Sequence, residues 1–239
     1  MNGKMARTIA SGSCALVVVL SAASPAQTQD SKTPYHTMAP IDRYLMDRNA
    51  EIAMARSAAP EAVARDADVL VLGRHGYETA VKGRSGFVCV VERSWMSPFD
   101  FPEFWNPKMR GPICFNPPAA RSILPLTLMR TELVLAGLSK AQIIDSLKAF
   151  DKKALPALEP GGMSYMMSRQ GYLNDSAGRW VPHLMFYAPL IGGMAWGADL
   201  SGSPVMLNPQ FQGAPEPVNV FMVPVPKWSD GTTASRDAN

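Results

Sequence analysis

The feature that most constrains the fold is the apolar run FVCVVE at residues 87–92. Successive side chains of a β-strand point to opposite faces, so Phe87, Cys89 and Val91 share one face and the two valines between them share the other. Because both sets are apolar, the strand has to be covered on both sides. The run therefore predicts a central strand with a packed layer on each face.

Further strands are predicted around this run. The segments DVLVLG (68–73) and YETAVKG (77–83) precede it, and the glycines of GRSG (83–86) suit a tight turn. We expect residues 68–92 to form a three-stranded antiparallel meander. Three more strands are expected near the C-terminal end, at 163–168, 183–189 and 218–225.

Helices are predicted before and between the two groups of strands. Residues 41–59 have apolar side chains at helical spacing, and a short helix follows Pro60. A later helix starts at Asn116–Pro117, is interrupted at Pro125 and ends at Gly137, and the next opens with a capping box formed by Ser139 and Gln142. This order predicts a single α+β domain, in which helices pack on an antiparallel sheet made of the meander and the C-terminal strands.

The first 26 residues have the pattern of a secretory signal peptide. Lys4 and Arg7 precede an apolar stretch that is densest at residues 14–23, and small residues follow up to Ala26. The apolar stretch is shorter than the roughly 20 residues that a bilayer span requires, and no other segment reaches that length. We therefore expect cleavage after residue 26, and a soluble protein exported to the periplasm or secreted.

The remaining chain is expected to contain a flexible segment at 27–37, the α+β domain at 38–228 and a disordered tail at 229–239. Loss of the two signal-peptide cations lowers the net formal charge from +3 to +1. Since no basic stripe is present, a nucleic acid is not expected as a partner. A small molecule is the expected partner, and the sequence leaves the oligomeric state open.

Two cysteines remain after signal removal, Cys89 and Cys114. Outside the cytoplasm an even pair of cysteines favours a structural disulfide. The alternative is two separate buried thiols, because free cysteine is often a core residue. A catalytic thiol is disfavoured, since burial in an apolar strand raises the pKa of Cys89 and hides its nucleophile.

The segment GRHGYE (73–78) contains the first candidate site residues. His75 and Glu78 could bind a metal or act as base and acid, with Tyr77 as an electrophilic hydroxyl. On a regular strand Glu78 points away from the other two, so they converge only if the glycines bulge the chain. The alternative is a hairpin bend with a surface histidine.

His183 is the second candidate, on a strand where it shares one face with Met185 and Tyr187. It is either a hydrogen-bonded structural histidine or a site residue. If the fold brings it to His75 and Glu78, the three side chains suit zinc or non-haem iron, with the two histidines as metal ligands. Copper is a weaker alternative, suggested by Met163, Met166 and Met167, because methionine is also an adaptable filler of cores and apolar pockets.

The aromatic segment 93–112 is predicted to be a long irregular loop, and such loops are often functional. Its residues Trp95, Phe99 and Trp105 are candidates for lining a ligand pocket. In the alternative interpretation they cover the sheet as part of the core.

No nucleotide-binding glycine loop, HExxH, CxxC or GxSxG motif is present in the sequence. The favoured function is therefore a small-ligand-binding or accessory module of the cell envelope. The alternative is a metal-assisted hydrolase that uses His75, Glu78 and His183, and it requires both histidines in one pocket. A third hypothesis, a structural or assembly protein of the envelope, predicts a wide exposed apolar patch.

Overall fold

The computed structural model describes residues 35–149, 156–208 and 218–234, which form an α+β domain around one eight-stranded sheet. The strand order is β2-β1-β3-β4-β5-β6-β8-β7, and every pairing is antiparallel except β1–β3. The strands are β1 (Asp68–Gly73), β2 (Gly76–Val81), β3 (Val88–Glu92), β4 (Gly111–Phe115), β5 (Met163–Met166), β6 (His183–Ala188), β7 (Met206–Leu207) and β8 (Asn219–Pro224).

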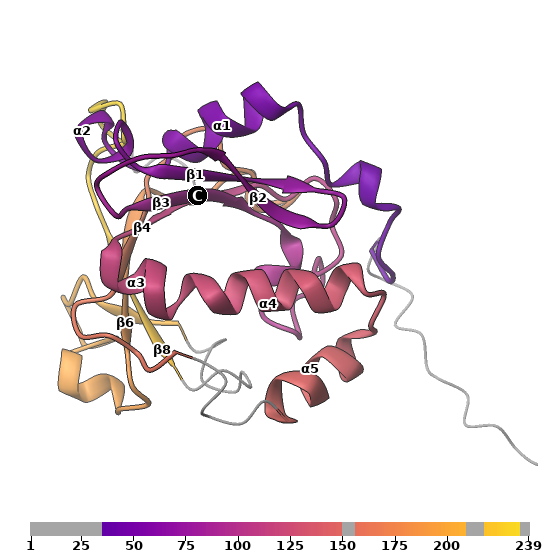
Figure 1. Ribbon diagram of the computed structural model, residues 1–239. Coiled ribbons are helices and arrows are strands. Elements are labelled where there is room, and N and C mark those ends of the chain that lie inside the picture. Colours follow the sequence, from indigo (N-terminus) through magenta and orange to yellow (C-terminus); the bar gives the residue numbers. More distant parts are fainter. Residues whose placement is uncertain (1–34, 150–155, 209–217, 235–239) are drawn as a thin grey trace, which may run out of the picture. The chain divides into compact units, whose positions relative to one another are not determined.

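Helices cover both faces of this sheet, as the apolar run at 87–92 predicts. The helices are α1 (Arg48–Arg56), α2 (Glu61–Ala64), α3 (Pro117–Ser122), α4 (Leu124–Leu135) and α5 (Lys140–Ala149), with short 3₁₀ turns at η1 (Ile41–Arg43), η2 (Ser94–Met96) and η3 (Gly193–Trp196). Figure 1 shows α1 on one side of strands β1 to β4 and α3 and α4 on the other.

The alternation within β3 decides which helix each residue meets. Cys89 and Val91 pack in a cluster with buried alanines, some within α1 and some in the segment that follows it. Val90 faces the other way and packs with Ile123 and Leu124, where α3 meets α4. The prediction of a strand covered on both faces is confirmed.

The predicted antiparallel meander is not formed, because β3 lies beside β1 and runs parallel to it. The chain between β2 and β3 does not turn back at once but crosses the start of β1. There the carboxylate of Asp68 accepts a hydrogen bond from the Gly83 amide, and the carbonyl of Asp66 accepts one from the Arg84 amide at 2.8 Å. Only a glycine fits at this crossing, since a Cβ on residue 83 would lie 2.0 Å from the Asp66 oxygen.

The helix starts follow the expected capping chemistry. Asp47 caps α1 and Asn116 caps α3, each through a carboxyl or amide oxygen that accepts a backbone N–H bond at 3.0 Å. The predicted break near Pro125 separates α3 from α4, and Gly137 follows α4 with a φ of 80°. Ser139 and Gln142 form the predicted capping box of α5.

Strand β4, which the sequence analysis does not predict, holds Cys114 directly opposite Cys89 of β3. The two cysteines form a disulfide, which confirms the predicted pair. Both are fully buried on the side of the sheet that α1 covers.

A buried ion pair links α1 to the residue that follows the end of β3. Glu51 is 1% exposed and Arg93 is fully buried, and their side chains meet at 2.8 Å. The same Glu51 oxygen accepts the backbone N–H of Leu72 in β1, and Arg93 donates to the carbonyl of Tyr44. The pair therefore fixes the helix on the sheet by hydrogen bonds as well as by charge.

The ends of the chain are described only in part. The expected signal peptide and residues 27–34 lie outside the described residues, as do residues 235–239. Residues 229–234 fall in the expected tail, yet Ser229 and Ala234 donate backbone hydrogen bonds to Met167 and Pro226. Over the ranges that the structure covers, no helix has the length and apolar character needed to cross a membrane.

Candidate functional site

Two adjoining cavities lie on the face of the sheet that α4 covers. The first has a volume of about 120 Å³ and the second, beneath α4, of about 60 Å³. They share Glu92, Met96 and Met185. The first cavity is lined by Glu92, Arg93, Met96, Ser97, Pro98, Phe101, Met109, Gly111, Met166, Leu173, Trp180, His183, Met185, Asn208 and Met222.

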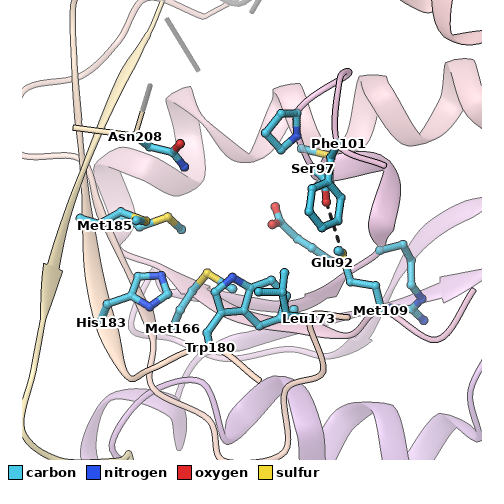
Figure 2. A pocket seen from close by; sticks show the side chains of 15 residues that line it. Glu92, Ser97, Phe101, Met109, Met166, Leu173, Trp180, His183, Met185 and Asn208 are labelled. Carbon is cyan, nitrogen blue, oxygen red and sulfur yellow. Dashed lines mark hydrogen bonds between the residues drawn. The ribbon is translucent and has the colours of Figure 1, made fainter. Parts of the chain in front are cut away.

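The register of the sheet explains why these side chains meet. Residues that face each other in an antiparallel pair point to the same side of the sheet. Met166 of β5 is opposite His183 of β6, and Met185 of β6 is opposite Met222 of β8. Figure 2 shows Met166, His183, Met185 and Glu92 around a common space, with Trp180 at its lower edge in this view.

Methionine dominates the lining. Five of the fifteen residues around the first cavity are methionines, and they come from three strands, from η2 and from the loop before β4. A long thioether side chain changes rotamer easily, so such a wall adapts to the shape of a ligand. Of the three methionines suggested for copper, Met166 lines the cavity, whereas Met163 and Met167 do not.

Glu92 is the acidic residue of the cavity wall. Its carboxyl accepts a hydrogen bond from Thr127 Oγ1 of α4 at 2.9 Å. Enclosure by apolar protein raises its pKa from 4.5 to about 7, although the Thr127 hydrogen bond and the positive charge of Arg130 act in the opposite direction. A large fraction of Glu92 is therefore neutral at physiological pH, and a neutral carboxyl both donates and accepts hydrogen bonds.

His183 contributes a second polar group to the same cavity. It is 3% exposed, and its Nδ1–H donates to the carbonyl oxygen of Val181 at 2.7 Å. Burial lowers the pKa of the imidazole, so the ring is neutral at physiological pH. With the proton on Nδ1, the other ring nitrogen is a hydrogen-bond acceptor. The predicted sharing of one face by His183, Met185 and Tyr187 is confirmed, since all three line these cavities.

The structure places the GRHGYE residues elsewhere. His75 is exposed in the two-residue turn between β1 and β2, where Gly73 pairs with Gly76 and the φ of Gly76 is 126°. Glu78 is exposed on β2 and forms an ion pair with Arg48. Tyr77 points into the protein and donates to the carbonyl of Val91 at 2.7 Å, and burial raises the pKa of its hydroxyl.

Consequently, His75 and His183 are not brought together. β2 and β6 are separated by four strands in the sheet order, and His75 is absent from the wall of the cavity that His183 lines. Among residues 35–149, 156–208 and 218–234, no three His, Cys, Asp or Glu side chains are grouped closely enough to hold a metal ion.

The aromatic residues of loop 93–112 are divided between core and cavity. Trp95 is fully buried and Trp105 is 5% exposed, and both belong to a core cluster with Tyr44. Phe99 stacks on Phe104 with ring centroids 5.3 Å apart. Phe101 is the aromatic residue of this loop that reaches the first cavity. Of the three residues suggested for a ligand site, none lines a described cavity.

Glu92 was missed by the sequence analysis, although a signal for it is present. It is the last residue of FVCVVE and continues the alternation of Val88 and Val90. By that alternation a carboxyl group is placed on a buried apolar face. An acidic residue in phase with buried valines is costly unless it has a partner or a role.

An exposed apolar group is present outside the cavities. Between β6 and β7, Leu190 is 60% exposed and Met194 79% exposed, and Ile191, Trp196 and Leu200 are also exposed. An assembly protein is expected to carry a wide apolar patch, of which exposed side chains such as these are the components. These exposed side chains are present in addition to the two cavities.

Comparison with known proteins gives no further guidance on the function, because no family model, no curated protein and no solved structure matches this chain.

Proposed function

We propose that the protein is a binding module for a small, mostly apolar molecule that carries one hydrogen-bonding group. The observation that supports this most strongly is the single carboxyl group of Glu92 on the wall of a methionine-rich cavity. Ligand pockets typically combine an apolar wall with a few placed polar groups.

The cavity volume sets the size of the ligand. An engineered protein cavity of about 150 Å³ accommodates benzene. The first cavity measures about 120 Å³, and the second, of about 60 Å³, shares three wall residues with it beneath α4. A single six-membered ring with a short substituent is the matching size.

The polar groups set the chemistry of the ligand. Neutral Glu92 can donate to a carbonyl or hydroxyl oxygen, and the Nε2 atom of neutral His183 can accept from a hydroxyl. A charged group would lose its hydration on entering this cavity without a counter-charge designed for it. Arg93 does not provide one, because Glu51 already pairs with it, and the charge of Arg130 on the wall of the second cavity acts on Glu92.

The proposal includes export of the protein from the cytoplasm. It is supported by the order of charged, apolar and small residues in the first 26 positions and by the Cys89–Cys114 disulfide, a bond that persists in oxidising compartments. The mass of the protein isolated from its host tests this part, since cleavage after residue 26 removes a defined mass.

A second candidate function is proton-transfer catalysis at Glu92. A carboxyl whose pKa of about 7 lies near the working pH suits a general acid or base, and it faces a cavity able to hold a substrate. This function would be established by a reaction whose rate depends on a group with that pKa and is abolished by Glu92→Gln. The metal-assisted hydrolase is not proposed in the form that uses His75, Glu78 and His183, because four strands separate β2 from β6 and His75 does not line the cavity of His183.

Binding is tested by titrating the protein with phenol and with benzene at pH 6, observed by NMR of the ligand. We expect both to bind, and phenol to bind about tenfold more tightly because of its hydroxyl group. Glu92→Leu should abolish this selectivity. The matched control Glu78→Leu changes an exposed carboxylate and should leave it intact. If neither phenol nor benzene binds, the result contradicts the proposal.

A further inference from the structure

A second hollow lies on the other side of Trp180. It has a volume of about 350 Å³, and Trp180 lines both this outer hollow and the first cavity. The remaining wall contains Tyr172, Trp228 and the two arginines Arg169 and Arg179. The two spaces are therefore neighbours that differ in chemistry. The first is mostly apolar, with the Glu92 carboxyl and an arginine, Arg93, that Glu51 already pairs with, and the outer one has two exposed arginines.

The charge of the outer hollow is positive. Arg169 and Arg179 both approach the ring of Trp228, with guanidinium carbons 5.9 and 5.6 Å from its centroid. No acidic residue is among the described residues of the wall. Arg169 donates to Thr232 at 3.1 Å and lies 4.0 Å from a carboxylate oxygen of Asp230, so part of its charge is already compensated.

The side chain of Arg179 has fewer polar contacts than that of Arg169. Its side chain is exposed, and within the described part of the chain its recorded contact is the one with the Trp228 ring. Stacking on an aromatic ring holds a guanidinium group in place while its N–H groups stay available. Such a group recognises the planar carboxylate of an organic acid.

Trp180 forms the partition between the two spaces. A Cβ added to Gly111, which lines the first cavity, would lie 3.5 Å from one end of the indole at Cη2. A Cβ added to Gly171, which lines the outer hollow, would lie 3.5 Å from Cε3. The indole therefore packs on the backbone of both chambers, and a ligand that reaches from one to the other has to pass it.

We infer that the ligand is a small amphipathic organic acid, with its apolar body in the inner cavity and its carboxylate on Arg179 and Arg169 in the outer hollow. Trp180 then lies beside the junction of the two parts. This inference rests on the proposed function and adds the class of ligand to it. It also explains why the inner cavity holds a carboxyl and the outer hollow holds arginines, since the arrangement orients an acid with its charge outward.

The test compares three compounds by isothermal titration at pH 6, where Glu92 is mostly neutral: 3-phenylpropionate, 3-phenylpropanol and acetate. The first two share the same apolar body, and the first and third share the carboxylate. We expect 3-phenylpropionate to bind about tenfold more tightly than the alcohol, the gain of one charge-assisted contact at a partly exposed site. Its affinity, unlike that of the alcohol, should fall as the salt concentration rises.

Arg179→Gln should remove the preference for the acid and leave the affinity for the alcohol unchanged. Arg65→Gln is the matched control, since Arg65 is exposed and pairs with Glu61 on α2. Equal binding of acid and alcohol, or an unchanged preference in Arg179→Gln, would overturn the inference while the apolar-binding proposal stands. Acetate binding as tightly as 3-phenylpropionate would also overturn it, because the inner cavity would then be unused. If neither phenyl compound binds, the proposed function fails and this inference fails with it.

Discussion

Replacement of Glu92 by glutamine should change how the stability of the protein depends on pH. In the folded protein the pKa of Glu92 is raised from 4.5 to about 7, so the folded state holds this proton more tightly than the unfolded chain does. The resulting stabilisation is fully present below about pH 4.5 and is lost as the pH rises through about 7. A shift of this size corresponds to roughly 3 kcal/mol of unfolding free energy.

The measurement is urea denaturation of the wild type and of Glu92→Gln at several pH values from 4.5 to 8.5. Glutamine keeps the size and the hydrogen-bonding capacity of the side chain but does not titrate, so it can still accept from Thr127. As the pH rises across this range, the unfolding free energy of the wild type should fall by roughly 3 kcal/mol relative to that of the variant. Parallel pH profiles for the two proteins would refute the reasoning, because Glu92 would then titrate as an exposed carboxyl does.

Three further changes test the fold. Joint replacement of Cys89 and Cys114 by alanine opens a loop of 25 residues and should lower the free energy of unfolding by about 3–4 kcal/mol, measured by urea denaturation. Glu51→Gln leaves a buried arginine charge without its partner and should cost about 3–5 kcal/mol, whereas Glu61→Gln, at an exposed pair, should cost less than about 1 kcal/mol. Gly83→Ala places a Cβ 2.0 Å from a backbone oxygen and should lower the melting temperature.

The sequence predicts the local elements of this fold well, because they depend on local chemistry. Alternation within residues 87–92 identifies the central strand and the two faces that helices cover. Asn116 and Ser139 mark two helix starts because their side-chain oxygens can accept from the first free amides. Both signals are contained in fewer than about ten neighbouring residues, so they can be read without the tertiary structure.

The pairing of the strands depends on contacts that the local pattern does not contain. Residues 83–86 carry the glycines of a tight turn, yet the carbonyl of Asp66 and the carboxylate of Asp68 bind this segment and lead it across β1. The parallel β1–β3 pair follows from that crossing. The same limit applies to His75 and His183, whose separation is set by the order of the strands.

The candidate site was recognised only in part from the sequence. His183 and its face were identified, and methionine was interpreted as filler or as the wall of an adaptable pocket. Trp95 and Trp105 belong to the core because their loop folds over Tyr44, which the loop composition alone does not show. Glu92 was not singled out from the sequence, and its place in the cavity becomes visible once α4 is placed over that face.

The most direct test of the proposed binding site is a crystal structure of the protein soaked with 4-bromophenol, in which bromine is located by its anomalous scattering. The account predicts a bromine peak inside the cavity beside Met185 and Met222, with the phenol oxygen within hydrogen-bonding distance of Glu92 or His183. A peak confined to the exposed apolar side chains near Met194, with the cavity empty, would contradict the account and would favour a protein that acts through its surface.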